Sequence, residues 1–175
     1  MQKNLPTLWK ALTILLALFY SCQFQQDTSS QGKADHAKAQ IEADTKKLLA
    51  AFLEEENMNN VDQLLDPALK FHWPDKTVLD KEGLMNACRE LTQKHDNKTE
   101  IIDIAVDGNR SFILFVWSGE VMEDDNPNLK GRQFSIHDCW RLTWENGKIV
   151  EWYTIWGSMD YLMQLGYIIS PPSMQ

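Results

Sequence analysis

The sequence predicts an α+β fold, because helical and strand patterns occupy separate stretches of the chain. Apolar residues recur at helical spacings over residues 35–58 and again over 81–95. From about residue 98 the period changes to two, as in strands that bury one face. We therefore expect three helices with one short early strand, then a meander of long strands. This meander should form a strongly curved antiparallel sheet wrapped around the N-terminal helices.

Each helix pattern has its own boundary signals. A short second pattern at residues 61–65 must end before Pro67, because a residue ahead of proline is pushed out of the α region. The third pattern begins after Asp80, a favoured N-cap residue. Between them "LKFHW", stopped by Pro74, predicts the short strand. The first helix has these apolar residues on one face: Ile41, Leu48, Leu49, Phe52 and Leu53.

Two hairpins are predicted in the second half of the chain. "TEIIDIAVDG" and "RSFILFVWSGEVM" are joined by Asp-Gly-Asn at residues 107–109. "RQFSIHDCWRLTWE" and "KIVEWYTIWG" are joined by Glu-Asn-Gly-Lys at residues 145–148, the clearest turn in the chain. Residues 158–166 predict a last helical turn or two, closed by Gly166.

Composition excludes some classes of partner. The chain has 25 acidic and 17 basic residues, a net charge of −8, whereas nucleic-acid binding needs clustered Lys and Arg. No His or Cys pair has ligand spacing, and the acidic loop at residues 123–126 lacks the glycine and terminal Glu of a calcium loop. There is no Gly-rich phosphate loop and no G-x-S-x-G motif. We expect no nucleic acid, no metal and no cofactor.

Residues 1–21 have the pattern of an export signal. Lys3 and Lys10 precede an apolar run that is about half the length needed to span a bilayer. "LFYSC" resembles a bacterial lipobox, whose cysteine, here Cys22, receives lipid that holds the protein on a membrane. We expect a lipoprotein on the periplasmic or cell-surface side of a membrane. The alternatives are an ordinary signal peptide cut elsewhere, or a short membrane anchor.

The remaining chain divides into a tether, one domain and a tail. Residues 22–36 are polar and predict a flexible tether, residues 37–168 the domain and residues 169–175 a C-terminal tail. Cys88 lies on a predicted helix and Cys139 in mid-strand, so we expect two buried thiols. A disulfide, which exported proteins can form, is the alternative.

The end of the chain carries a family motif. "DCWRLTWENGKIVEWYTIWGSMDYLMQLG" resembles the SnoaL-like branch of the nuclear transport factor 2-like superfamily. Relatives have a strand D-x-W-R-apolar, a turn D/N-G-K-I, the sequence V-E-H-W-D-x-W-D and a helix ending L-x-x-L-G. "FHWPD" at residues 71–75 also resembles the family's short strand, and the likeness extends over about residues 40–166. The matching residues are Asp138, Trp140, Arg141, Asn146, Gly147, Lys148, Ile149, Val150, Glu151, Trp156, Leu162, Leu165 and Gly166.

This resemblance implies a cone-shaped nuclear transport factor 2-like fold but does not decide the function. The superfamily includes cyclases, isomerases, dehydratases, hydrolases, binding proteins and domains without known activity. This chain also departs from the pattern. It has Trp152 and Thr154 where many relatives have His and Asp, and Gly157 where they have a closing Asp. Three groups that could move protons are therefore missing.

Alternation along the strands selects the candidate site residues. On residues 134–144 the even positions are apolar except Asp138, so this carboxylate should face the helices. Burial would raise its pKa and suit it to act as a general acid or base. The alternative is a structural carboxylate satisfied by a helix N-terminus, a Tyr hydroxyl or Arg. On the next strand Val150, Trp152, Thr154 and Trp156 should share the inner face.

His72 is the candidate partner for Asp138, although a lone histidine is more often structural. His137 should point to the opposite face, because it is adjacent to Asp138 in sequence. Trp117 and Tyr153 are expected on the outer face of the sheet, where they would favour a homodimer. The expected pocket is formed by His72, Asp138, Trp140, Trp152, Thr154 and Trp156.

Three functions remain open at this point. The first is a lipid-anchored domain that binds a small, largely apolar molecule in an aromatic pocket. The second is an enzyme of the cyclase, isomerase, dehydratase or hydrolase type, in which Asp138 transfers protons with help from His72. The third is a protein-interaction domain whose interior is filled by its own side chains.

Overall fold

The computed structural model describes residues 32–52 and 57–167. The chain forms two units, residues 1–39 and residues 40–175, and the second contains the sheet. In the first unit residues 32–39 are helical, so helix replaces the predicted tether from residue 32. The alanines and lysines of this stretch have high helix propensity. The prediction missed the helix because it relied on the low content of apolar residues.

The predicted signal peptide, the lipidation site Cys22 and the tail at residues 169–175 lie outside the described residues. Within the described ranges, no helix has the length and apolar character required to cross a membrane.

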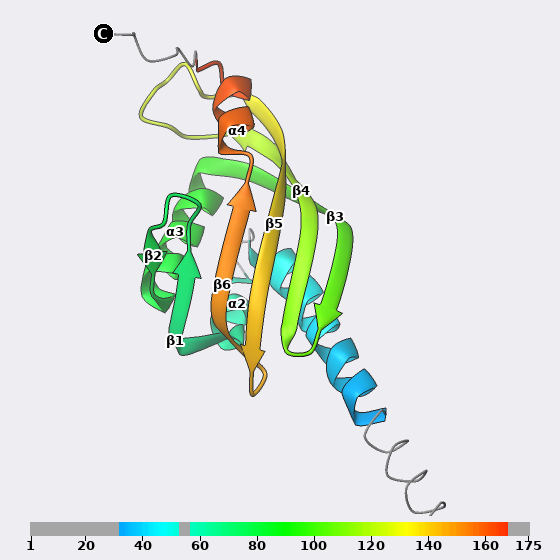
Figure 1. The fold of residues 1–175 in the computed structure, drawn as a ribbon. Helices are drawn as coiled ribbons and strands as arrows, with labels where there is room; N and C mark the ends of the chain where they lie inside the picture. Colours follow the sequence, from blue (N-terminus) through cyan, green and yellow to red (C-terminus); the bar gives the residue numbers. More distant parts are fainter. Residues whose placement is uncertain (1–31, 53–56, 168–175) are drawn as a thin grey trace, which may run out of the picture. The chain divides into compact units, whose positions relative to one another are not determined.

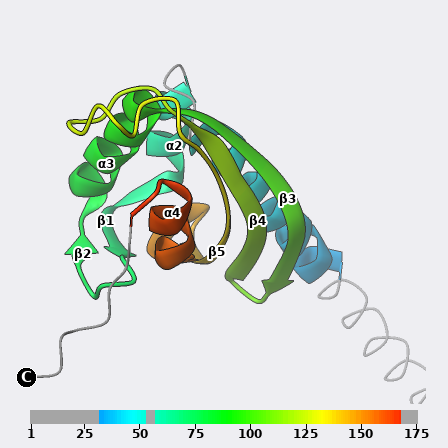
Figure 2. The same cartoon turned by 90° about the horizontal axis from the view of Figure 1, so that it is seen from above.

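The second unit is a six-stranded sheet with helices, and it confirms the predicted α+β class (Figure 1). After the helical residues 40–52, the elements are α2 (Met58–Leu64), β1 (Leu65–His72), β2 (Val78–Leu79), α3 (Lys81–Lys94), β3 (His95–Asp107), β4 (Arg110–Val121), β5 (Gln133–Glu145), β6 (Lys148–Trp156) and α4 (Ser158–Gln164). The strand order is β2-β1-β6-β5-β4-β3, and Figure 2 shows the strong bend of β3, β4 and β5.

The sheet is mixed, whereas the sequence predicted an antiparallel one. β1 pairs with β6 in parallel, with Phe71 opposite Trp152 and His72 opposite Tyr153. A pairing between the first and the sixth strand leaves no turn signal in the sequence, because parallel strands are joined by long connections. The other strand pairs are antiparallel, as expected.

Both predicted hairpins form. Asn146 and Gly147 have φ values of 50° and 74°, the left-handed conformations that a type I′ turn needs. Gly108 has a φ of 58° at the β3–β4 turn. Asp80 also acts as the predicted N-cap of α3, because its carboxylate accepts a hydrogen bond of 2.8 Å from the Gly83 amide.

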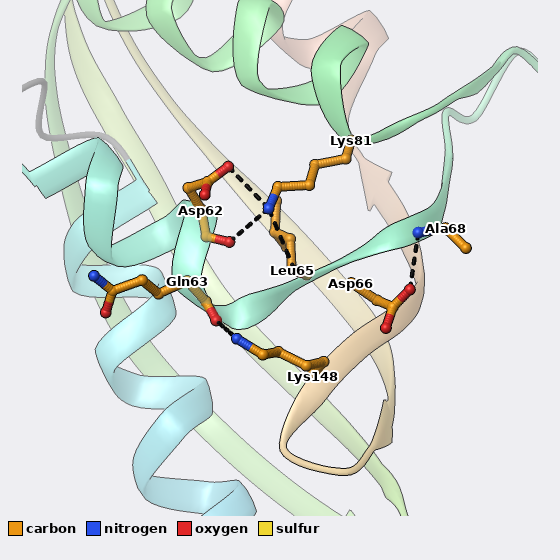
Figure 3. A network of polar contacts seen from close by, with 7 residues as sticks. All are labelled: Asp62, Gln63, Leu65, Asp66, Ala68, Lys81 and Lys148. Carbon is orange, nitrogen blue, oxygen red and sulfur yellow. Dashed lines mark hydrogen bonds and ion pairs between the residues drawn. The ribbon is translucent and has the colours of Figure 1, made fainter.

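A polar network holds β1 between α2, α3 and β6 (Figure 3). The Lys81 ammonium donates to the Asp62 carbonyl at 2.9 Å and pairs with the Asp62 carboxylate at 2.9 Å. Lys148, on β6, donates to the carbonyl of Gln63. Lysines at the C-terminal end of a helix satisfy carbonyls that have no partner within the helix. The network therefore fixes the start of β1, the strand that brings Phe71 to the interior.

The helical residues 40–52 pack on the sheet through both apolar and polar contacts. Phe52 contacts Trp140 with ring centroids 4.8 Å apart. The buried hydroxyls of Thr45 and Ser111 are hydrogen-bonded at 2.8 Å, and the Trp144 indole donates to Ser111 at 2.9 Å. Buried polar groups are costly unless they are paired, so this chain of bonds fixes the helix against β4 and β5.

Alternation defines the inner face of the sheet. All six even positions of β5 are buried, from Phe134 to Trp144, as predicted. On β4, where both faces are apolar in sequence, the odd positions are the buried ones. β6 departs from prediction, because a register shift between Thr143 and Trp144 buries Ile149 and leaves Val150 only half-buried.

Cys88 and Cys139 are both free thiols. Cys88 is buried on α3 as predicted, but Cys139 is only half-buried, because it belongs to the outward-facing odd positions of β5.

Candidate functional site

A cavity of about 90 Å³ lies between the inner face of the sheet and the helices. It contacts both Asp138 and Trp156, as a ligand pocket predicted from the sequence should. Eight of its eleven lining side chains are aromatic. The lining residues are Phe52, Phe71, Trp73, Leu91, Phe115, Trp117, Asp138, Trp140, Thr154, Trp156 and Tyr161.

The rings come from several elements that meet around the cavity. Phe115 and Trp117 are inward-facing positions of β4, and Trp140 is the matching position of β5. Phe115 and Trp140 meet edge to face, with centroids 4.7 Å apart and planes at 73°. Such arrangements place the electropositive edge of one ring against the electronegative face of another. The rings therefore form a continuous, well-packed wall.

Asp138 is the only charged residue among the described cavity-lining residues. It is 8% exposed, and the Thr154 hydroxyl donates a hydrogen bond of 3.0 Å to its Oδ1 atom. Burial raises the pKa of Asp138 to about 6, and hydrogen bonds from Thr154, Trp140 and the Cys139 amide oppose that rise only in part. In the described part of the chain, no Lys, Arg or His lies within ion-pair distance of this carboxylate. Asp138 is therefore a buried acid that changes charge near neutral pH.

His95 and Tyr161 form a second polar pair beside the cavity. The Tyr161 hydroxyl lies 2.9 Å from Nε2 of His95, whose Nδ1 lies 3.1 Å from the Leu91 carbonyl. Burial lowers the pKa of His95 and raises that of Tyr161 to about 12. A neutral His95 that donates from Nδ1 and accepts from Tyr161 satisfies both contacts. His95 is the first residue of β3, and its side chain is buried.

His72 does not reach the cavity, so the predicted His72–Asp138 pair is wrong. Phe71 faces inward, and alternation along β1 turns His72 to the other face. There its ring stacks on Tyr153 at 4.0 Å with planes at 3°, and its Nε2 lies 3.4 Å from Glu151. His72 therefore belongs to a group on the outer face.

Trp152 is also outside the cavity lining, against prediction. It is fully buried behind the wall, with its ring centroid 4.6 Å from that of Trp140. Trp117 was expected on the outer face but faces inward, and its indole donates to the Asn97 side chain at 2.8 Å. Both faces of β4 are apolar, so alternation alone could not show which face Trp117 occupies. Asp138, Trp140, Thr154 and Trp156 are the predicted pocket residues that the structure brings together.

The sequence also left several lining residues unassigned. Phe115 could have been identified only with the register between β4 and β5, and Phe71 only with the parallel pairing between β1 and β6. Leu91 and Tyr161 lie on helices, and Trp73 follows β1, so their approach to the cavity depends on tertiary packing.

The outer face of the sheet retains some exposed apolar side chains. Ile155 is 70% exposed, and Phe112 and Leu114 are also exposed. Tyr153 lies on this face as expected, where the Arg141 guanidinium packs 4.0 Å from its ring centroid. The homodimer through this face stays a prediction.

Comparison with known families agrees with the fold. The model of the SnoaL-like domain family matches residues 46–152, more than half of the 175-residue chain. The chain belongs to the SnoaL-like domain family. No curated protein matches this SnoaL-like chain.

Solved structures share the SnoaL-like fold at low sequence identity. AclR from Streptomyces galilaeus, described as a hydroxylase, has a TM-score of 0.67 and 15% identity, over 78% of this chain and 91% of that one. IdmH from Streptomyces antibioticus, described as a polyketide cyclase, has a TM-score of 0.61 and 21% identity, over 70% and 98%. A ketosteroid isomerase-like protein from Catenulispora acidiphila, solved in complex with trimethylamine, has a TM-score of 0.56 and 13% identity, over 71% and 97%. At these identities the likeness establishes the fold alone.

Replacing Asp138 by Asn should stabilise the protein at neutral pH. Because the folded-state pKa is raised from 3.8 to about 6, the burial cost is absent below pH 3.8 and complete above pH 6. The full cost corresponds to about 3 kcal/mol, and the amide of Asn avoids it. Urea unfolding should therefore show a gain for Asp138→Asn that grows from pH 4 to pH 6 and then levels off.

Asp103→Asn is the matched control, because Asp103 is exposed on β3. Its difference from the wild type should be small and nearly constant over the same pH range. A destabilised Asp138→Asn at pH 7.5 would show that the carboxylate is a structural acceptor rather than an unpaired charge.

Proposed function

We propose that this SnoaL-like domain binds a small, largely apolar molecule in its aromatic cavity. The observation that carries the proposal is the cavity itself, which has eight aromatic rings and one carboxylate in its lining. Ligand sites are typically apolar hollows with a few polar groups that orient the ligand. The cavity argues against an interior filled by the protein's own side chains.

The size of the cavity limits the ligand. An apolar protein cavity of about 150 Å³ holds benzene, whereas this one measures about 90 Å³. A second hollow, lined by Trp73, Pro74, Asp75, Trp156 and Ser158, shares its two tryptophans with the cavity. Trp73 and Trp156 therefore border both the cavity and this second hollow. A ligand of the size of benzene or larger, which includes toluene and choline, therefore needs side chains of the lining, such as these tryptophans, to move.

Retention of a small ligand after purification would support binding directly. Native mass spectrometry of the mature domain should show a mass excess that disappears on denaturation. Trp156→Ala should lose the bound species, because it removes one wall of the cavity. Phe112→Ala, at an exposed position of β4, is the control for loss of an aromatic ring outside the lining. The proposal would be contradicted by a wild-type protein that shows no mass excess and whose tryptophan fluorescence does not change when toluene is added.

We also propose that Cys22 carries lipid and holds this domain at a bacterial membrane surface. Support comes from the sequence alone, in which a charged start and a short apolar run precede "LFYSC". Acyl chains contribute about 0.8 kcal/mol of membrane affinity per buried CH₂ group.

Cys22→Ala should therefore move the protein from the membrane fraction to the soluble fraction or leave it unprocessed. Globomycin, which blocks lipoprotein processing, should have a matching effect on the wild type. Cys139→Ala is the control, because that thiol lies in the folded domain. Unchanged membrane fractionation of Cys22→Ala would remove the lipid anchor from the account.

An enzyme acting by proton transfer is the second candidate, and the raised pKa of Asp138 favours it. A carboxyl group with a pKa of about 6 can give or take a proton near neutral pH. Because His72 points away, Asp138 would work with Thr154, whose hydroxyl donates a hydrogen bond to the carboxylate. Asp138→Asn should then abolish turnover of any substrate found, whereas Thr154→Ser should retain it. Turnover that survives Asp138→Asn would exclude this mechanism.

A further inference from the structure

We infer that the ligand of the cavity is a small organic cation, an ammonium group that carries short alkyl substituents. This inference rests on the proposed binding function and specifies its ligand class. Three features of the described residues lead to it: an unpaired buried carboxylate, a surrounding wall of aromatic faces and edges, and an acidic entrance.

Asp138 lacks a counter-charge. The carboxylate is buried, and none of the described residues that line the cavity is a Lys, Arg or His. Buried charges in proteins are normally paired, because an isolated charge in an apolar site loses its hydration without compensation. A cationic ligand would supply the missing partner. A neutral apolar ligand would remove remaining water from Asp138 and give nothing in return.

The aromatic wall favours the same charge. Trp156 lies 6.3 Å from Trp117, 6.5 Å from Trp73 and 5.6 Å from Tyr161, measured between ring centroids. The planes of these pairs meet at 66° to 74°, so neighbouring rings meet edge to face, and all four rings line the cavity. Ring faces attract cations within about 6 Å, and alkylated ammonium groups gain from both the charge and the apolar contact.

The entrance is acidic as well. Asp75 lines the hollow that shares Trp73 and Trp156 with the cavity. Hydrogen bonds from Thr77 lower the pKa of Asp75, so it remains a carboxylate over the pH range of interest. The whole chain carries a net charge of −8. A field of this sign raises the local concentration of cations and disfavours anionic ligands.

The choice of probe isolates charge from shape. Choline and 3,3-dimethylbutan-1-ol have nearly the same shape and differ in the quaternary nitrogen, which is a neutral carbon in the second. Both are compact, and both carry a hydroxyl that can accept a hydrogen bond. The indole N–H of Trp156 is a buried donor without a partner among the described residues, so it can take that role.

We expect choline to bind the wild-type domain at pH 7.5 at least tenfold more tightly than 3,3-dimethylbutan-1-ol, measured by tryptophan fluorescence and calorimetry. At pH 5.0 the preference should shrink severalfold, because Asp138, with a pKa of about 6, then becomes largely neutral. Tyr161 is the other titratable lining group, and its pKa of about 12 keeps it neutral throughout. His95, behind Tyr161, has a lowered pKa and would become a repelling cation only at low pH.

Variants separate these contributions. Asp138→Asn should abolish most of the preference for choline at pH 7.5 and most of its pH dependence. Any pH dependence that remains in this variant would come from protonation of His95. Asp103→Asn, on an exposed position of β3, should behave as the wild type. Retained preference in a folded Asp138→Asn would overturn the role of Asp138. The wild-type comparison at two pH values gives the same test if that variant fails to fold.

The outcomes distinguish the inference from the function on which it rests. Equal or tighter binding of 3,3-dimethylbutan-1-ol would overturn the cation inference and leave a site for apolar ligands. Binding of toluene without choline would do the same. If choline, its neutral analogue and toluene all fail to bind, both the inference and the proposed function are wrong.

Discussion

The antiparallel pairing of β5 with both β4 and β6 is the constraint on which the interior depends. It aligns Phe115 with Asp138 and Asp138 with Trp156 across three strands, so one carboxylate lies among aromatic rings. Because paired positions share a face, Asp138 cannot turn outward unless the register of the whole strand changes. Its hydrogen bond from Thr154 partly compensates burial, and the remaining cost appears as a raised pKa. Burial of Asp138 therefore lowers the free energy of unfolding at neutral pH and places a carboxylate in the cavity lining.

The departures from the family pattern now have a structural meaning. Trp152, in place of a frequent family histidine, is buried behind the aromatic wall and contacts Phe71 and Trp140. Thr154, in place of an acid, donates to Asp138 instead of adding a second carboxylate. His72 lies on the other face with Tyr153 and Glu151, so Asp138 has no histidine partner in the described residues. These replacements leave Asp138 as the single acid in the described cavity lining.

Sequence reasoning reached the fold class, the hairpins and the inward position of Asp138, because these follow from local periodicity and turn chemistry. It failed where a residue's face depends on a distant partner. The parallel β1–β6 pair and the direction of Trp117 are of this kind. The register shift near Trp144 exchanged Val150 for Ile149, and a shift of one residue reverses which side chains are buried. His72 was misplaced because the inner face of β1 could not be known from a short strand with apolar neighbours on both sides.

The central claim is that Asp138 is a buried carboxyl group without a cationic partner. A carbon-13 NMR titration of the side-chain carboxyl, assigned by comparison with Asp138→Asn, measures this most directly. In the ligand-free domain the pKa of Asp138 should be about 6, since burial outweighs the hydrogen bonds to the carboxylate. A pKa at or below the ordinary Asp value of 3.8 would mean that a cation or stronger hydrogen bonds already compensate the charge, and would contradict the account.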